Sequence, residues 1–507
     1  MAILKVKTKD GWVEGIPGSN QAISLFRGIP YAAPPVGELR WKEPQPVKPW
    51  DGVLKAYKFT NICWQERVAS EGSGDVIGNE FYCLDHPMSE DCLTLNVWTP
   101  AKREDEKLPV AVYFHGGGYS TGYGFLNAYD GEGFGKRGCI FVTVTHRLNA
   151  FGFLAHPWLT AENEHHSSGN YGALDLVAAL DWVQENIAAF GGDPKKVTIF
   201  GQSGGGGKVQ TMIASPLAQG KFRGAIMQSG GGLGAKKGIM ESGKLAYGEK
   251  FGMDFFEHMG FKSLEDARAC APDVLLQGLK EFASTRGGIM DAMGPKVDGY
   301  LLEEHPSEVF LAGKHPELNY MVGCTAEEFV NEKAVLPSKE EARALAEKLY
   351  GEDAEKYLAA IHLEDDPEQA LAAFKYGFGL GMLANAKAWV ENEVRLGRKP
   401  SYQYYLTLVP PGAKYAHHSA EHHYVFQTLI RSYRPYTGQD YDLSNTLADY
   451  WANFVKAGDP NGGNNPRWEP FTAEKPEALE ITYGPHMAAV PESDYVKFLK
   501  NRALDIK

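Results

Sequence analysis

The stretch "KVTIFGQSGGGG", residues 196–207, joins a short apolar run to a glycine-rich turn that contains one serine. The pattern G-x-S-x-G after a strand and before a helix is typical of a nucleophile elbow, a sharp turn that projects a serine hydroxyl from a sheet edge. Gly201 and Gly205 leave room for such a turn, and Gly204 lets the backbone approach a substrate. We interpret Ser203 as a nucleophile; the alternative is a glycine-rich turn with an incidental serine.

Further short apolar runs surround this stretch, and segments with helical spacing lie between them. Short, continuous apolar runs are typical of strands that are covered on both faces. Strands that alternate with helices predict an α/β protein with a mostly parallel central sheet, helices on both faces and helical insertions. Without a repeat or a linker, we expect one domain over residues 1–507. The predicted strands lie at 108–114, 139–146, 196–200, 224–228, 319–323 and 401–409, and the helices at 174–190 and 443–457.

The loop after the apolar run 108–114 reads "HGGGYSTG" (115–122). In α/β proteins of this type, ligands bind beyond the carboxyl ends of the strands, where this loop and the serine turn meet. Acyl transfer places negative charge on a carbonyl oxygen, and backbone N–H groups of glycines stabilise that charge without obstruction. The predicted oxyanion-hole donors are Gly117, Gly118 and Gly204, although such a loop alone would also fit a flexible turn.

A serine hydroxyl needs a base, and the base needs a carboxylate that orients it. Candidate acids lie in "CTAEEF" (324–329), and candidate histidines lie in "HHSAEHHYVF" (417–426). Their order after Ser203 is the order expected for this fold, serine then acid then histidine. Residues 418–422 also fit the inverted zinc-protease pattern H-x-x-E-H, so the histidines alone leave a metal site open.

The composition limits the classes of partner. The formal net charge is -13, which disfavours binding to the phosphate backbone of nucleic acids. No apolar run reaches the roughly 18 residues of a membrane span, and the N-terminus does not resemble a secretory signal. We therefore expect a cytoplasmic protein with reduced cysteines, either a monomer or a small homo-oligomer. Of the cysteines at 63, 83, 92, 139, 270 and 324, those at 139 and 324 lie in apolar runs and are expected to be buried.

Nearly the whole chain resembles the type-B carboxylesterases, the α/β-hydrolase family that includes bacterial para-nitrobenzyl esterases and cholinesterases. This resemblance implies hydrolysis of a small-molecule ester through an acyl-enzyme intermediate, with no metal and no organic cofactor. Besides "HGGGYSTG", the motifs that carry it are "FRGIPYAAPPVGELRW" (26–41), "SEDCLTLNVWTP" (89–100), "HRLNAFGFL" (146–154), "GNYGALDLVAALDWVQENIAAFGGDPKKVTIFGQSGGG" (169–206) and "LADYWANFVKAGDPN" (447–461).

The resemblance selects among the candidate residues. It places Glu328 at the position of the triad acid and Glu327 at that of its acidic neighbour. His418 takes the position of the general base, and Glu421 takes a position that we interpret as structural. The remaining histidines, at 417, 422 and 423, are then expected to be loop and packing residues.

The resemblance also implies features away from the triad. Cys63 and Cys92 match the first disulfide pair of the family, but a cytoplasmic location predicts that they stay reduced. Two structural ion pairs are implied, namely Arg40 with Glu90 and Arg147 with Asp175.

The chain departs from the family pattern near the predicted site. Gln202 stands where the family has glutamate, and a neutral amide attracts no cation, so we expect a preference for uncharged esters over choline esters. Gly204 replaces the usual alanine, Phe329 replaces a glycine after the acid, and residues 422–423 replace Leu-Pro.

The sequence therefore predicts a serine carboxylesterase for small uncharged aryl or alkyl esters. One alternative is an interaction protein that has the same fold but no activity, although the set Ser203, Glu328 and His418 is intact. The other is a metallohydrolase that uses the histidines of residues 417–423.

Overall fold

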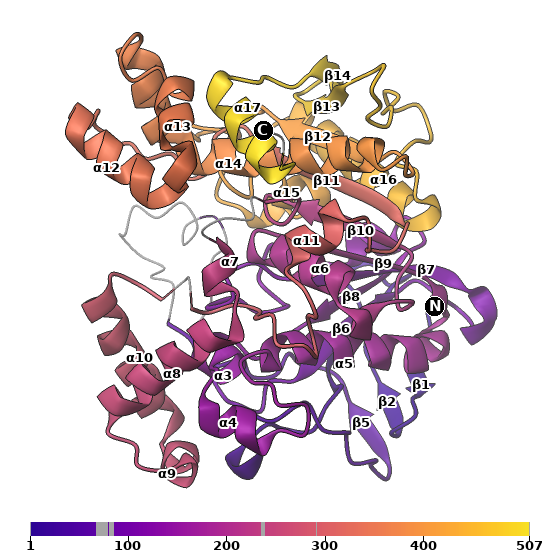
Figure 1. The fold of residues 1–507 in the computed structure, drawn as a ribbon. Helices are drawn as coiled ribbons and strands as arrows, with labels where there is room; N and C mark the ends of the chain where they lie inside the picture. The colour runs from indigo at the N-terminus through magenta and orange to yellow at the C-terminus, as the bar shows by residue number, and fades with distance from the viewer. Residues whose placement is uncertain (1, 67–79, 81–85, 235–238, 290–291, 506–507) are drawn as a thin grey trace.

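The computed structural model describes residues 2–66, 80, 86–234, 239–289 and 292–505 (Figure 1). Its centre is a large mixed sheet with the strand order β14-β13-β12-β11-β10-β9-β7-β8-β6-β4-β3. The strands are β3 (Ile16–Pro17), β4 (Ser24–Pro30), β6 (Thr94–Thr99), β7 (Leu108–Phe114), β8 (Ile140–Val144), β9 (Gly192–Gln202), β10 (Gly224–Gln228), β11 (Asn319–Thr325), β12 (Tyr402–Leu406), β13 (Glu477–Ile481) and β14 (His486–Ala489).

Strands β8, β7, β9, β10, β11, β12 and β13 run parallel to their neighbours, and antiparallel strands flank them on both sides. All six predicted strands are confirmed, and those at 108–114 and 224–228 have the predicted bounds. A separate small sheet near the N-terminus contains β1 (Lys5–Lys7), β2 (Trp12–Glu14) and β5 (Val53–Lys55).

Helices connect the strands and form the insertions that the sequence predicts. Those between β10 and β11 include α8, α9 and α10, and those between β11 and β12 are α12, α13 and α14. The helices are α2 (Glu132–Gly135), α3 (Asn149–Phe153), α4 (Pro157–Glu162), α5 (Tyr171–Asn186), α6 (Gly204–Ala214), α7 (Ile239–Ser242), α8 (Leu245–Met259), α9 (Leu264–Ala269), α10 (Pro272–Arg286), α11 (Pro306–Leu311), α12 (Lys339–Tyr350), α13 (Ala354–Ala360), α14 (Pro367–Arg395), α15 (His422–Val425), α16 (Gly438–Ala457) and α17 (Asp494–Ala503).

Both faces of the sheet are covered, because successive side chains of a strand point to opposite faces. In β7, Val110 and Val112 belong to a core cluster that also contains residues of α5 and α6. Ala111 and Tyr113 belong to a second cluster, which contains residues of α16. The continuous apolar runs in the sequence therefore reflect strands buried on two sides.

The two predicted helices differ from the structure at their ends. The helix predicted at 174–190 begins earlier, at Tyr171, and its last turn is a 3-10 helix over Ile187–Phe190. The helix predicted at 443–457 begins at Gly438, because the side chains of Thr437 and Asp440 form a capping box there.

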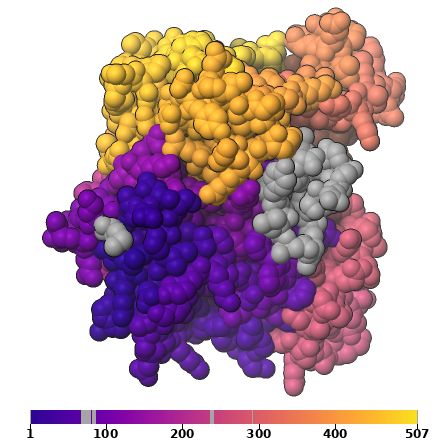
Figure 2. Space-filling view, turned by 180° about the vertical axis from the view of Figure 1, so that it is seen from behind, coloured from indigo at the N-terminus to yellow at the C-terminus, as the bar shows by residue number. Residues whose placement is uncertain are grey.

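Most of the helical insertions lie beside the sheet, whereas α14 packs against β11 and β12. In Figure 1, α8–α10 and α12–α13 form two groups on the same side of the molecule. Figure 2, seen from behind, shows the C-terminal part as an upper layer that rests on the N-terminal part. In the part of the chain that the structure describes, no helix has the length and apolarity needed to cross a bilayer.

Candidate active site

Ser203 is the single residue between strand β9, which ends at Gln202, and helix α6, which begins at Gly204. Its backbone has φ 57° and ψ −128°, a conformation that residues other than glycine rarely adopt. A Cβ on Gly201 would lie 2.5 Å from the carbonyl carbon of Gly205, so the turn requires glycine at that position. The sequence therefore folds locally into the sharp strand–turn–helix corner that the G-x-S-x-G pattern predicts.

The loop after β7 brings its glycines next to this corner. Gly117 and Gly118 have φ angles of 91° and 57°. A Cβ on Gly204 would lie 2.7 Å from the backbone nitrogen of Gly118, so the candidate donors are adjacent. A methyl group at residue 204 would therefore crowd the Gly118 N–H.

Glu328 lies in the loop after β11 and is fully buried. Its Oε1 accepts a hydrogen bond from the Thr325 N–H at 2.8 Å, and its Oε2 accepts one from Nδ1 of His418. Helix α14 fixes the loop from behind, because a Cβ on Gly379 would lie 3.0 Å from Cβ of Glu328. Burial alone would raise the pKa of the Glu328 carboxyl, but the charge and hydrogen bond of His418 hold that pKa below its ordinary value.

His418 lies in the loop after β12, and its ring is almost completely buried. Because Nδ1 donates to Glu328, Nε2 is the nitrogen left to act as a base. The side-chain amide of Gln202 lies 3.1 Å from this Nε2 and donates to it. Over the residues that the structure describes, no hydrogen bond joins the Ser203 hydroxyl to His418. The ring of Phe329 covers a face of the imidazole, with ring centroids 4.0 Å apart.

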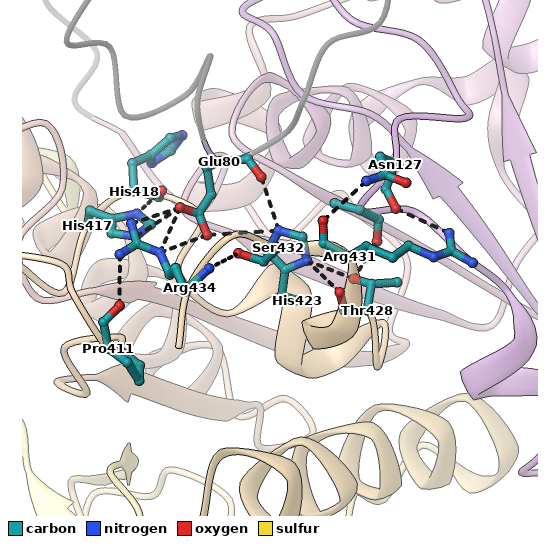
Figure 3. A network of polar contacts seen from close by, with 11 residues as sticks. Glu80, Asn127, Pro411, His417, His418, His423, Thr428, Arg431, Ser432 and Arg434 are labelled. Carbon is teal, nitrogen blue, oxygen red and sulfur yellow. Dashed lines mark hydrogen bonds and ion pairs between the residues drawn. The ribbon is translucent and has the colours of Figure 1, made fainter. Parts of the chain in front are cut away.

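The histidines at 417 and 423 belong to one polar network around Glu80 (Figure 3). Nδ1 of His417 donates to the carbonyl oxygen of His418 at 2.9 Å, and its Nε2 accepts from Arg434 at 3.3 Å. Nε2 of His423 lies 3.1 Å from the backbone oxygen of Glu80. In Figure 3 the His418 imidazole points away from this network. Arg434 forms a buried ion pair with the Glu80 carboxylate, and burial lowers the pKa of His417.

The arrangement does not resemble a metal site. Nε2 of His422 lies 3.1 Å from the Tyr113 hydroxyl, away from the partners of the other histidines. Within the described ranges, no group of three or more His, Cys, Asp or Glu side chains has a geometry that holds a metal ion. The histidines at 417, 422 and 423 are buried, as expected for packing residues, but the expectation of a loop is wrong at 422–423, because His422–Val425 form one turn of helix.

Glu421 is fully buried behind the candidate triad. Its Oε1 accepts from the Gln228 amide at 3.2 Å and from the Tyr404 hydroxyl at 3.3 Å. Burial and the negative charge of Glu328 raise the pKa of Glu421 to about 7. These contacts fit the structural role that the sequence predicts for this residue.

The predicted ion pairs are confirmed and are buried. Arg40 and Glu90 form two hydrogen bonds, of 2.7 and 2.6 Å, and Arg147 contacts both carboxylate oxygens of Asp175, at 2.6 and 2.9 Å.

The predicted burial of two cysteines is also confirmed. Cys63 and Cys92 are buried free thiols in contact with each other, and their hydrogen bond and burial raise the pKa of Cys92; Cys83 lies outside the described residues. The cysteines whose burial the sequence predicts, Cys139 and Cys324, are buried as well.

Three features of the site were not expected from the sequence. Phe329 was recognised as a departure from the family, but its contact with His418 was not. Gly379 gives a signal only in retrospect, as a glycine within a long helix that must pack closely against another backbone. The pairing of Arg434 with Glu80 joins residues far apart in the chain and has no local signal.

The strand order, the serine corner and the loops that converge on it define an α/β-hydrolase. Solved structures agree: two PNB esterase structures superimpose with TM-scores of 0.79 and 0.82 at 28% sequence identity, covering 98% of this chain and 99% of each PNB esterase chain. The chain belongs to the carboxylesterase family, whose model matches residues 3–499.

Curated relatives are esterases as well. The fumonisin B1 esterase of Sphingopyxis macrogoltabida is 32% identical over 475 residues, which cover 92% of this chain and 84% of the relative. The cocaine esterase of Homo sapiens is 30% identical over 520 residues, which cover 96% and 88%. The liver carboxylesterase of Sus scrofa is 31% identical over 510 residues, which cover 93% and 88%. Membership of this family supports hydrolysis of carboxylic esters.

Proposed function

We propose that this chain is a serine carboxylesterase in which Ser203, Glu328 and His418 form the catalytic triad. The observation that carries the proposal is the hydrogen bond between Glu328 and Nδ1 of His418, which leaves Nε2 as the base, next to the strained corner at Ser203. Gly117, Gly118 and Gly204 supply the N–H donors of the oxyanion hole in this proposal.

The reaction has two steps. Ser203 Oγ attacks the ester carbonyl while Nε2 of His418 takes the hydroxyl proton, and the oxyanion receives hydrogen bonds from the glycine N–H groups. The same nitrogen then gives its proton to the departing alcohol, which leaves an acyl group on Ser203. A water molecule, deprotonated by His418, releases the carboxylic acid and restores the serine. Glu328 stabilises the imidazolium in both steps.

Gln202 takes part in the proposed reaction through its hydrogen bond to His418. In the free enzyme its amide donates to Nε2 of His418, the atom that has to accept the serine proton. Substrate binding therefore has to exchange this hydrogen bond for one from Ser203. The substrates that fit best are small uncharged aryl or alkyl esters, because a neutral amide beside the base offers nothing to a cationic group.

The test is a comparison of Ser203→Ala with the wild type on an aryl ester, with Ser284→Ala on the exposed side of α10 as a control. We expect Ser203→Ala to lower kcat by about 10⁶ and to abolish labelling by a fluorophosphonate, whereas Ser284→Ala leaves both unchanged. Near-normal hydrolysis by Ser203→Ala would remove this serine from the mechanism.

A further inference from the structure

Two phenylalanines near the candidate triad are exposed to an unusual degree. Across the described ranges, Phe329 and Phe378 are the only exposed phenylalanines, at 43% and 58%. They also touch each other, with ring centroids 5.1 Å apart in an edge-to-face arrangement. Exposed apolar groups that gather at one place mark a surface that binds something.

Phe329 has a strained backbone as well as an exposed ring. Its φ of 43° lies in the left-handed region, which is costly for a bulky side chain. The family has glycine at this position, and glycine would adopt the same backbone without strain. A strained and exposed phenylalanine directly after Glu328 therefore calls for a role that glycine does not fill.

The contact with His418 indicates that role. Nδ1 of the imidazole is bonded to Glu328, so the alcohol that departs from the ester carbon takes its proton from Nε2. The Phe329 ring lies on a face of the same imidazole, with 4.0 Å between the ring centroids. The oxygen of the departing alcohol lies at Nε2 in this step. The group bonded to that oxygen is therefore within reach of the Phe329 ring.

Helix α14 holds the second ring of the pair beside the first. Phe378 precedes Gly379, whose close contact with Glu328 fixes this turn of the helix against the acid loop. Gly381 lies three residues after Phe378 and therefore on the same face of α14. A Cβ on Gly381 would meet nothing within 4 Å, so this face is open next to the exposed ring.

We propose that Phe329 and Phe378 form the subsite for the alcohol part of the substrate, and that this part is an uncharged aromatic group. The proposal rests on the proposed esterase function and specifies its substrate class. Edge-to-face and offset-stacked ring pairs favour an aromatic alcohol over an aliphatic one of equal reactivity. Phe329 is then a specificity-determining residue whose benefit offsets its backbone strain.

The test uses three esters, two acetates and one phenylacetate, whose alcohols are equally good leaving groups. Benzyl acetate and methyl acetate differ by a phenyl ring on the alcohol side, and methyl phenylacetate has the ring on the acyl side. We expect the ratio of kcat/KM for benzyl acetate to that for methyl acetate to fall about tenfold in Phe329→Ala and in Phe378→Ala, mainly through KM. The ratio of methyl phenylacetate to methyl acetate should stay constant.

Three further variants keep the result interpretable. Phe329→Tyr retains a ring and should retain the benzyl preference. Phe329→Gly removes the ring and the strain together, so it should fold and still lose the preference. Tyr441→Ala removes an exposed ring from α16 and should change neither ratio.

Two outcomes would overturn the subsite, and both leave the benzyl-to-methyl ratio unchanged in the two alanine variants. Either kcat/KM stays constant for every ester, or it falls equally for all three esters, which would mean that the rings only position His418. In both cases labelling of Ser203 by a fluorophosphonate would continue, so the esterase proposal would survive. If the wild type hydrolyses none of the esters and Ser203 is not labelled, both proposals fail together.

Discussion

The side-chain amide of Gln202 lies 3.1 Å from Nε2 of His418, at the nitrogen that the proposed mechanism requires as a base. A carboxylate in this place would attract both the imidazolium and a cationic substrate. In Gln202→Glu we therefore expect the turnover of butyrylcholine relative to its neutral isostere, 3,3-dimethylbutyl butyrate, to rise about tenfold. Steady-state kinetics with the two esters measure this ratio, which in the wild type should favour the neutral ester.

The control for this change is Gln277→Glu, which adds the same charge on the exposed surface of α10. Its ratio of the two esters should equal that of the wild type. If the wild type already turns over butyrylcholine faster than the neutral ester, the inference from the neutral amide is wrong.

The oxyanion hole gives a second prediction. In Gly204→Ala the new methyl group would lie 2.7 Å from the Gly118 nitrogen and would push this donor out of place. Since the loss of one donor typically lowers kcat by about 10²–10³, we expect a fall of this size with little change in KM. Gly438→Ala makes the same chemical change where a Cβ meets nothing, and it should behave as the wild type. Equal kcat values for the two variants would show that a methyl group at residue 204 leaves the Gly118 donor in place.

The buried Glu421 predicts a dependence of stability on pH. Its pKa is raised from an ordinary value of 4.5 to about 7, so between these pH values the folded protein keeps a proton that the unfolded chain releases. Stability from this group therefore falls as pH rises from about 4.5 to 7, by at most about 3 kcal/mol. Glu421→Gln has no proton to lose, so its urea unfolding midpoint relative to the wild type should rise between pH 5 and pH 7.5. A constant difference between the two proteins would show that Glu421 is ionised in both states.

The sequence predicted the central fold well because the signals are local. Each apolar run that stops at glycine or a polar loop became a parallel strand, and the G-x-S-x-G pattern after such a run became the corner at Ser203. Topology then supplied the rest, since the loops after parallel neighbouring strands meet at one edge of the sheet. Glu328 and His418 follow strands β11 and β12, which are neighbours, and the structure joins them by a hydrogen bond.

The sequence failed where a contact depends on packing between distant segments. Phe329 reaches His418 only because the acid loop and the histidine loop converge, and no spacing in either loop encodes the ring contact. The start of α16 at Gly438 was missed because Thr437 and Asp440 form a capping box before the first buried apolar position. The apolar pattern alone does not extend a helix into such a polar first turn.

The last prediction concerns the buried pair of Arg434 and Glu80. Arg434 also donates to the Pro411 carbonyl oxygen at 3.1 Å and to Nε2 of His417 at 3.3 Å, so it fastens the loop before His418 at two points. In Arg434→Met the Glu80 carboxylate stays buried without its counter-charge, and we expect a loss of about 3–5 kcal/mol in unfolding free energy, with a lower kcat. Urea unfolding and steady-state kinetics measure the two effects.

A double variant separates the effect of the unpaired Glu80 charge from the effect of the lost Arg434 hydrogen bonds. Adding Glu80→Gln to Arg434→Met removes the unpaired charge, so most of the stability should return, whereas kcat should stay low because Pro411 and His417 still lack their donor. Arg103→Met breaks an exposed pair with Asp105 and should change stability by less than about 1 kcal/mol. Full recovery of kcat in the double variant would mean that Arg434 only neutralises Glu80, and that the histidine loop holds His418 without its help.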